Sequence, residues 1–91
     1  MIMGKEKMPE DVNTFLNFFW VSIPKDWKIH HKYEKSFLFI VVIMHHDINK
    51  KPFTIRRKYG SDIIIKFKEN ILSLAQNSAN EVIESMRNKI E

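Results

Sequence analysis

The stretch Phe37-Leu38-Phe39-Ile40-Val41-Val42-Ile43-Met44 holds eight consecutive apolar residues. Its β-branched and aromatic side chains favour an extended strand, and it is far shorter than the ~20 residues that a bilayer-spanning helix needs. A strand that is apolar on both faces is typical of the middle of a sheet. We therefore expect residues 37–44 to form the central strand, and the rest of the fold follows from what lies on either side.

The segments before and after this stretch alternate between apolar and polar residues, as half-buried strands do. In the first, Trp27, Ile29, His31 and Tyr33 share one face, and Lys28, His30 and Lys32 share the other. In the second, which Pro52 opens, Phe53, Ile55, Arg57 and Tyr59 face one way, and Thr54, Arg56 and Lys58 face the other. Glu34–Ser36 is a tight connection and His45–Lys51 a polar loop. The pattern predicts an antiparallel three-stranded meander in which cations of the outer strands flank the apolar central strand.

A helix is predicted from Pro9 to the residue before Pro24. Proline is favoured in the first turn, and acidic residues at 10 and 11 suit the positive end of the helix dipole. Apolar residues recur at spacings of three and four, at Val12, Phe15, Leu16, Phe19 and Ile23. We expect this helix to be embedded in the core. Phe18, Trp20 and Val21 widen its apolar surface, so an aromatic anchor for a partner stays an alternative.

After a break at Tyr59–Asp62, helical spacing continues to the end of the chain and predicts one long helix from about Asp62 to Lys89. Ser61 or Asp62 can serve as its N-cap. Two alternatives remain open. Residues 63–67 are rich in isoleucine and could form a fourth strand, and Ser78–Glu81 matches a capping box at which the helix could restart.

An unbroken helix of this length would measure roughly 40 Å at ~1.5 Å per residue. A domain of this size has a radius of gyration near ~12 Å, so the helix should overhang its sheet. We therefore predict a homodimer through the C-terminal half of the helix. The expected interface consists of Leu72, Ala75, Ala79, Val82, Ile83, Met86 and Ile90. The alternative is that the first helix covers these side chains within one chain.

The chain has 91 residues, of which 44% are hydrophobic, and this suffices for one core. We predict a flexible lead-in over residues 1–8 and a single α+β domain over residues 9–91. Its order is α-β-β-β-α, with both helices on one sheet face. There is no cysteine, no apolar span of membrane length and no apolar stretch after the charged N-terminus, so we expect a soluble, cytoplasmic protein that does not bind membranes.

Positive charge is concentrated in the middle of the chain. Residues 25–58 carry nine Lys or Arg against three acids, a net charge of +6, whereas the remaining residues carry six against eight, a net charge of −2. Such asymmetry bears on partners. We predict a nucleic-acid-binding surface made of Lys28, His30, Lys32, Lys50, Lys51, Arg56, Arg57 and Lys58. Trp27, Tyr33 and Tyr59 are interleaved with these cations and could stack on bases.

Catalytic and metal-binding patterns are absent from the sequence. It has only two glycines and so no phosphate-binding glycine loop, no His-Glu-x-x-His motif and no recognised nucleophile. The pairs His30-His31 and His45-His46 place one imidazole on each face of a strand, and the hairpin geometry keeps the two pairs on the order of ~16 Å apart. One zinc ion cannot bridge that distance. We therefore expect no cofactor, no metal and no enzymatic activity.

These observations predict a small non-enzymatic binding protein, either a nucleic-acid-associated regulator or an accessory factor of a nucleoprotein complex. The excess of Ile, Lys and Asn, with twelve Lys against three Arg, indicates AT-rich codons and hence a low-GC bacterium, a phage or another mobile element. The sequence does not distinguish DNA from RNA. The alternative is a protein–protein inhibitor or adaptor that acts through an apolar sheet face or the C-terminal helix.

Overall fold

A three-stranded antiparallel sheet forms one layer of the molecule. The computed structural model describes residues 7–45 and 52–90. Strand β1 is Lys28–Glu34, β2 is Phe37–Met44 and β3 is Phe53–Gly60, and they lie in the order β1-β2-β3. The predicted meander and its apolar central strand are therefore confirmed. Along β2, Leu38 pairs with Tyr33 on one side and with Tyr59 on the other.

The β1–β2 hairpin turns on two residues in the left-handed region, Lys35 with φ 52° and Ser36 with φ 66°. Positive φ at both central residues is the requirement of a type I′ turn, whose twist matches that of the flanking strands. The carbonyl oxygen of Ser36 accepts a hydrogen bond of 2.9 Å from the backbone N–H of Ser61. This bond ties the tip of the hairpin to the segment that follows β3.

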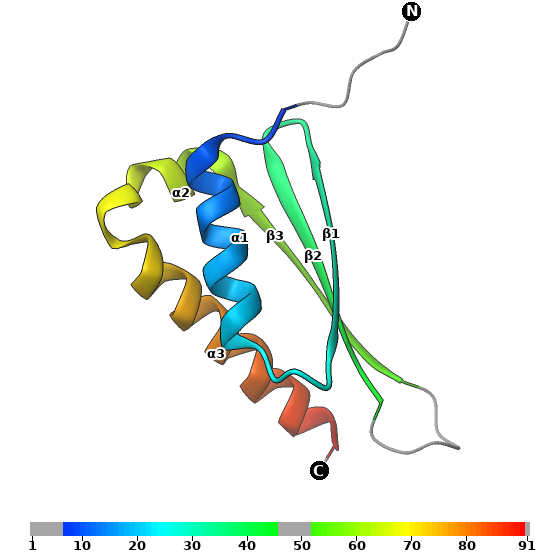
Figure 1. Ribbon diagram of the computed structural model, residues 1–91. Helices are drawn as coiled ribbons and strands as arrows, with labels where there is room; N and C mark the ends of the chain where they lie inside the picture. Colours follow the sequence, from blue (N-terminus) through cyan, green and yellow to red (C-terminus); the bar gives the residue numbers. More distant parts are fainter. Residues whose placement is uncertain (1–6, 46–51, 91) are drawn as a thin grey trace, which may run out of the picture.

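Among the described residues, helices cover only one face of the sheet, as predicted. Figure 1 shows α1 (Glu10–Ser22) and α3 (Ile71–Ile90) on the same side of the strands. Helix α1 follows Pro9, carries Glu10 and Asp11 in its first turn, and gives way to extended backbone at Ile23, before Pro24. Alternate residues of β2, namely Leu38, Ile40, Val42 and Met44, point toward the helices and are at most 5% exposed. We call this side the inner face of the sheet.

The single long helix expected after Gly60 is wrong. The chain forms α2 (Ser61–Lys66), a short 3-10 turn η1 (Lys68–Asn70) and then α3. At Phe67 the backbone leaves helical geometry, with φ −101° and ψ 26°, and its N–H bonds back to the carbonyls of Ile63 and Ile64 at 3.2 and 3.1 Å. The change of direction lets α3 run back along α1. The break falls at the end of the β-rich stretch 63–67, most of which is helical and not a fourth strand, while the capping box at Ser78 lies inside α3.

The dimer interface expected on the last helix requires correction. Ala75, Ala79, Val82 and Met86 are fully buried within one chain. They belong to a single core cluster with α1 and the inner sheet face, so the alternative, in which the first helix covers them, is what the structure shows. Leu72 is 47% exposed and Ile83 is half-buried. The side chain of Ile90 lies outside the described residues.

The result is a two-layer molecule, only 17 Å thick along its shortest axis. Most of the expected lead-in, residues 1–6, lies outside the described part of the chain, as does most of the loop before Pro52. Within the described ranges, no helix is both long and apolar enough to cross a membrane.

Candidate nucleic-acid interface

The face of the sheet opposite the helices carries the candidate site. Among the described residues, no helix packs on it (Figure 1). Because the side chains of paired residues point to the same face, the register defines this outer face row by row. It consists of Lys28, His30, Lys32 and Glu34 on β1, Phe37, Phe39, Val41 and Ile43 on β2, and Thr54, Arg56 and Lys58 on β3.

Two rows of cations flank an apolar stripe on the outer face. Phe39 lies between Lys32 and Lys58, and Val41 lies between His30 and Arg56. All five of the predicted site residues on this face, Lys28, His30, Lys32, Arg56 and Lys58, are exposed. Neighbouring strands are ~4.8 Å apart, so the two rows lie about 10 Å apart on either side of the stripe. The predicted flanking of the central strand by these five residues is therefore confirmed.

One acidic residue interrupts the basic surface. The ammonium of Lys32 lies 3.6 Å from a carboxylate oxygen of Glu34, and both side chains are more than half exposed. Such a surface pair is worth little in stability, yet it partly neutralises a cation at this end of the outer face. The strongest positive potential is therefore expected away from Glu34, toward Lys28 and Arg56.

Arg57 does not belong to the outer face. It pairs with Ile40 on the inner face, and its guanidinium donates to the hydroxyl of Ser85 on α3 at 3.5 Å and to the carbonyl of Arg56 at 2.9 Å. Its inclusion with the outer-face cations is therefore corrected, although the alternation already placed it with Ile55 and Tyr59. Lys50 and Lys51 lie outside the described residues.

The aromatic residues expected to stack on bases lie on the inner side. The Tyr59 ring packs between Phe15 and Phe19 of α1, with ring centroids 5.1 and 6.1 Å away. Burial raises the pKa of Tyr59 above its usual value, while a hydrogen bond with the Ser78 side chain partly offsets this. Trp27 and Tyr33 pack against the same core. These three rings therefore hold the helices on the sheet and are not available to a ligand on the outer face.

Phe37 and Phe39 supply the outward-facing rings that the sequence pattern did not single out; Phe37 is exposed and Phe39 is half-buried. They are successive outward residues of β2, with ring centroids 6.4 Å apart and planes inclined by 50°. Phe37 is 38% exposed, and the ammonium of Lys58 lies 4.7 Å from its ring centroid. The alternation along 37–44 already separated these residues from Leu38 and Ile40, but it did not show which set the helices cover.

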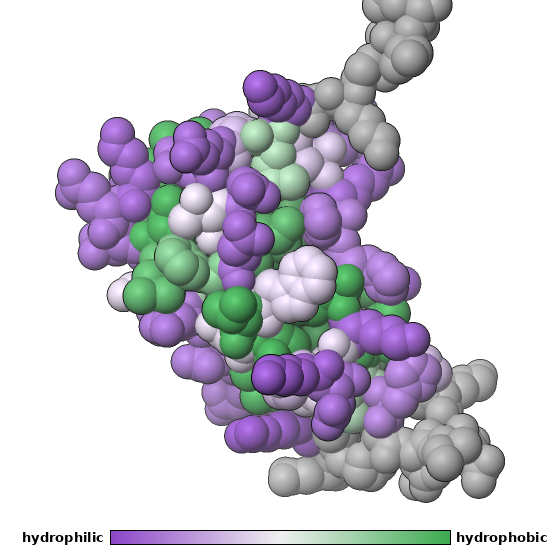
Figure 2. Space-filling view, viewed as in Figure 1, coloured by the Kyte–Doolittle hydropathy of each residue, from purple (hydrophilic) through white to green (hydrophobic). Residues whose placement is uncertain are grey.

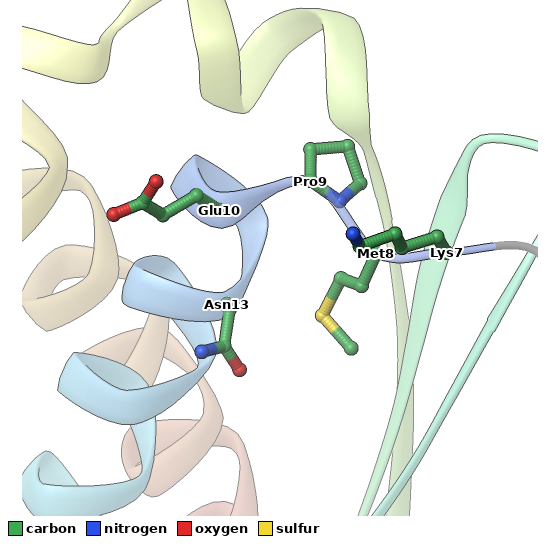
Figure 3. Close-up of a pocket in the computed structure, with 5 residues that line it drawn as sticks. All are labelled: Lys7, Met8, Pro9, Glu10 and Asn13. Atoms are coloured by element: carbon green, nitrogen blue, oxygen red, sulfur yellow. The ribbon is translucent and has the colours of Figure 1, made fainter.

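One hollow away from the outer face, within the described part of the chain, lacks converging polar groups. A shallow hollow at the start of α1 is lined by Lys7, Met8, Pro9, Glu10 and Asn13. Figure 3 shows the Glu10 carboxylate and the Asn13 amide pointing in different directions. Within the described residues, no three His, Asp or Glu side chains gather closely enough to hold a metal ion.

Exposed apolar side chains also occur on the helical side. Four of them lie between α2 and the first turn of α3 and are between 40% and 54% exposed, namely Ile63, Ile65, Phe67 and Leu72. Figure 2 shows hydrophobic surface on the side of the molecule where these elements lie. Trp20 and Val21, at the end of α1, are exposed by 53% and 78% and border a groove with Pro24 and Trp27. We call Ile63, Ile65, Phe67 and Leu72 together the α2 patch.

No family model matches the chain, and neither the curated proteins nor the solved structures contain a significant match.

Proposed function

We propose that this protein binds nucleic acid through the outer face of its sheet, as a small cytoplasmic regulator or accessory factor without catalytic activity. One observation carries the proposal: on a face that no described helix covers, Lys28, Lys32, Arg56 and Lys58 form two rows beside an apolar stripe. Cations of this kind neutralise backbone phosphates, and the release of counterions drives association. Apolar stripes rimmed by polar groups are characteristic of interaction sites.

The charge of the outer face sets the expected strength of the salt dependence. Four cations against one partly paired carboxylate allow three to four phosphate contacts. Each phosphate contact contributes about −0.7 to −0.9 to the slope of log affinity against log salt, so the slope should be about −2 to −4.

Fluorescence anisotropy with labelled single-stranded and duplex oligonucleotides over a salt series tests the proposed binding and its salt dependence. Arg56→Gln should weaken binding and make the slope shallower by about one unit. Arg57→Gln is the matched control, because this neighbour on β3 lies on the inner face. The proposal is wrong if no oligonucleotide binds at low salt, if affinity does not depend on salt, or if the two substitutions have equal effects.

A protein partner is a second candidate, and the α2 patch favours it. A chain of this size places four large apolar side chains, Ile63, Ile65, Phe67 and Leu72, at the surface of a short segment. An inhibitor or adaptor would bury them. The test is nuclease-resistant association with a defined partner. Phe67→Ser should abolish this association and Arg56→Gln should leave it intact. The opposite pattern would assign the association to the outer face.

A further inference from the structure

The outer face holds more apolar surface than the fold requires. In an antiparallel sheet with one covered face, the solvated face is normally polar. Here β1 and β3 obey this rule on the outer face with Lys28, Lys32 and Arg56, whereas β2 presents Phe37, Phe39, Val41 and Ile43 in an unbroken row. The core is complete without them, because the inner-face residues of β2 already pack under the helices. The outward apolar row of β2 is therefore suited to contact a ligand with apolar faces.

The two phenylalanines are placed to receive flat groups. Their centroids are 6.4 Å apart, about the ~7 Å repeat of successive residues on one face of a strand. Gly60 pairs with Phe37, so the residue of β3 directly opposite the ring places no side chain beside it. A Cβ at Gly60 would lie 3.6 Å from the ring, so glycine leaves that flank of Phe37 open.

We propose that the outer face binds single-stranded nucleic acid, with neighbouring bases stacked on Phe37 and Phe39 and phosphates held by the two cation rows. This rests on the proposed nucleic-acid function and narrows it to a substrate class. Unpaired bases expose their faces to aromatic side chains, whereas bases in a duplex already stack on one another. A sheet face whose apolar rings lie between cations therefore fits a single strand better than a duplex, which offers it only phosphates.

Lys58 links the stacking and charge functions. Without a ligand its ammonium lies over the Phe37 ring at 4.7 Å, where a base would stack. A stacking base displaces this ammonium from the ring, and the side chain, which starts from the β3 row, then reaches a phosphate at the edge of the stripe.

The experiment compares a single-stranded oligonucleotide of about 12 nucleotides with its duplex at one low salt concentration. The single strand should bind more tightly. Phe37→Leu and Phe39→Leu keep the apolar stripe but remove the rings, and each should weaken single-strand binding about 5- to 100-fold. Duplex binding and its salt slope should change little in these variants. Phe67→Leu is the matched control, because Phe67 is 43% exposed, close to the 38% of Phe37, but belongs to the α2 patch.

The outcomes separate the two proposals. If the duplex binds as tightly as the single strand and both leucine variants bind normally, this inference is overturned while the proposed function stands. If neither oligonucleotide binds at low salt, both are overturned. Circular dichroism and urea unfolding of each variant show that a loss of binding is not a loss of folding, and leucine keeps an apolar side chain at the exposed Phe37 and the half-buried Phe39.

Discussion

Replacing Gly60 should reveal whether this glycine serves the fold or the outer face. Its backbone, with φ −74° and ψ 135°, lies in the extended region that any residue adopts, so its conformational freedom is not needed. A Cβ at this position would meet Phe37 atoms at 3.6 and 3.9 Å and an Ile63 atom at 4.0 Å, which are ordinary contact distances. A substitution therefore meets no steric obstacle.

The expected change in the unfolding free energy on replacing Gly60 is the sum of two effects. Removing glycine lowers the entropy of the unfolded chain and stabilises a compatible site by about 0.4–1 kcal/mol. Gly60 is also the N-cap of α2 and makes no side-chain capping bond. A serine there can accept a hydrogen bond from the first turn and should add a few tenths of a kcal/mol, whereas alanine is a poorer N-cap than glycine. We expect Gly60→Ser to stabilise by about 1 kcal/mol and Gly60→Ala to change stability little.

Urea unfolding followed by the fluorescence of Trp20 and Trp27 measures both variants. In a domain of this size, 1 kcal/mol corresponds to a rise in melting temperature of about 4–8 °C. Equal effects of serine and alanine would refute the capping argument. A loss of more than about 1 kcal/mol in both variants would mean that the backbone at Gly60, or its distance from Phe37, differs from the geometry described above.

Three further predictions concern the turn, the core and pH. Ser36→Gly should stabilise the protein by about 0.5–1 kcal/mol in urea unfolding, because a non-glycine residue at positive φ is strained. The substitution keeps the backbone carbonyl of residue 36 that accepts the hydrogen bond from Ser61. A destabilised variant would contradict the turn geometry. Leu38→Ala, at a fully buried inner-face residue, should cost about 2–5 kcal/mol, whereas Val41→Ala, its outer-face counterpart, should cost clearly less; similar losses would mean that both faces are covered. Burial raises the pKa of Tyr59, so above its ordinary value of 10.0 the unfolded chain loses the phenol proton before the folded chain does. The unfolding free energy should therefore fall as pH rises beyond about 10, and more steeply in the natural protein than in Tyr59→Phe; parallel profiles of the two proteins would contradict this assignment.

The sheet could be predicted from the sequence because its signals are local. Alternation in residues 27–33 and 53–59 is a property of each strand alone, and it assigned Lys28, Lys32, Arg56 and Lys58 to one face correctly. The signals for the two ends of α1 were equally local, since Pro9 and two acidic residues mark its start and Pro24 marks its end. The elements that were predicted correctly are those whose geometry depends on residues a few positions apart in the sequence.

What could not be predicted depends on contacts between distant segments. No glycine or proline occurs between Ser61 and Ile90, so no helix-breaking residue marks the break at Phe67, after which α3 packs back against α1. The same packing buries Ala75 and Ala79 and removes the expected dimer surface. Phe37 and Phe39 were missed as candidate ligand contacts for a related reason: a strand apolar on both faces does not tell which face the helices will cover.

The meander has a consequence for the kinetics of folding. Every strand pairs with its neighbour in sequence, and the two-residue turn at Lys35 and Ser36 closes the first hairpin at small entropic cost. Helices α1 and α3, by contrast, lie about fifty residues apart along the chain and meet only after a long loop has closed. We expect the hairpins to be formed in the folding transition state and the α1–α3 contact to complete it. Substitutions at the turn should then alter the folding rate, while truncations at Val82 or Met86 should chiefly accelerate unfolding.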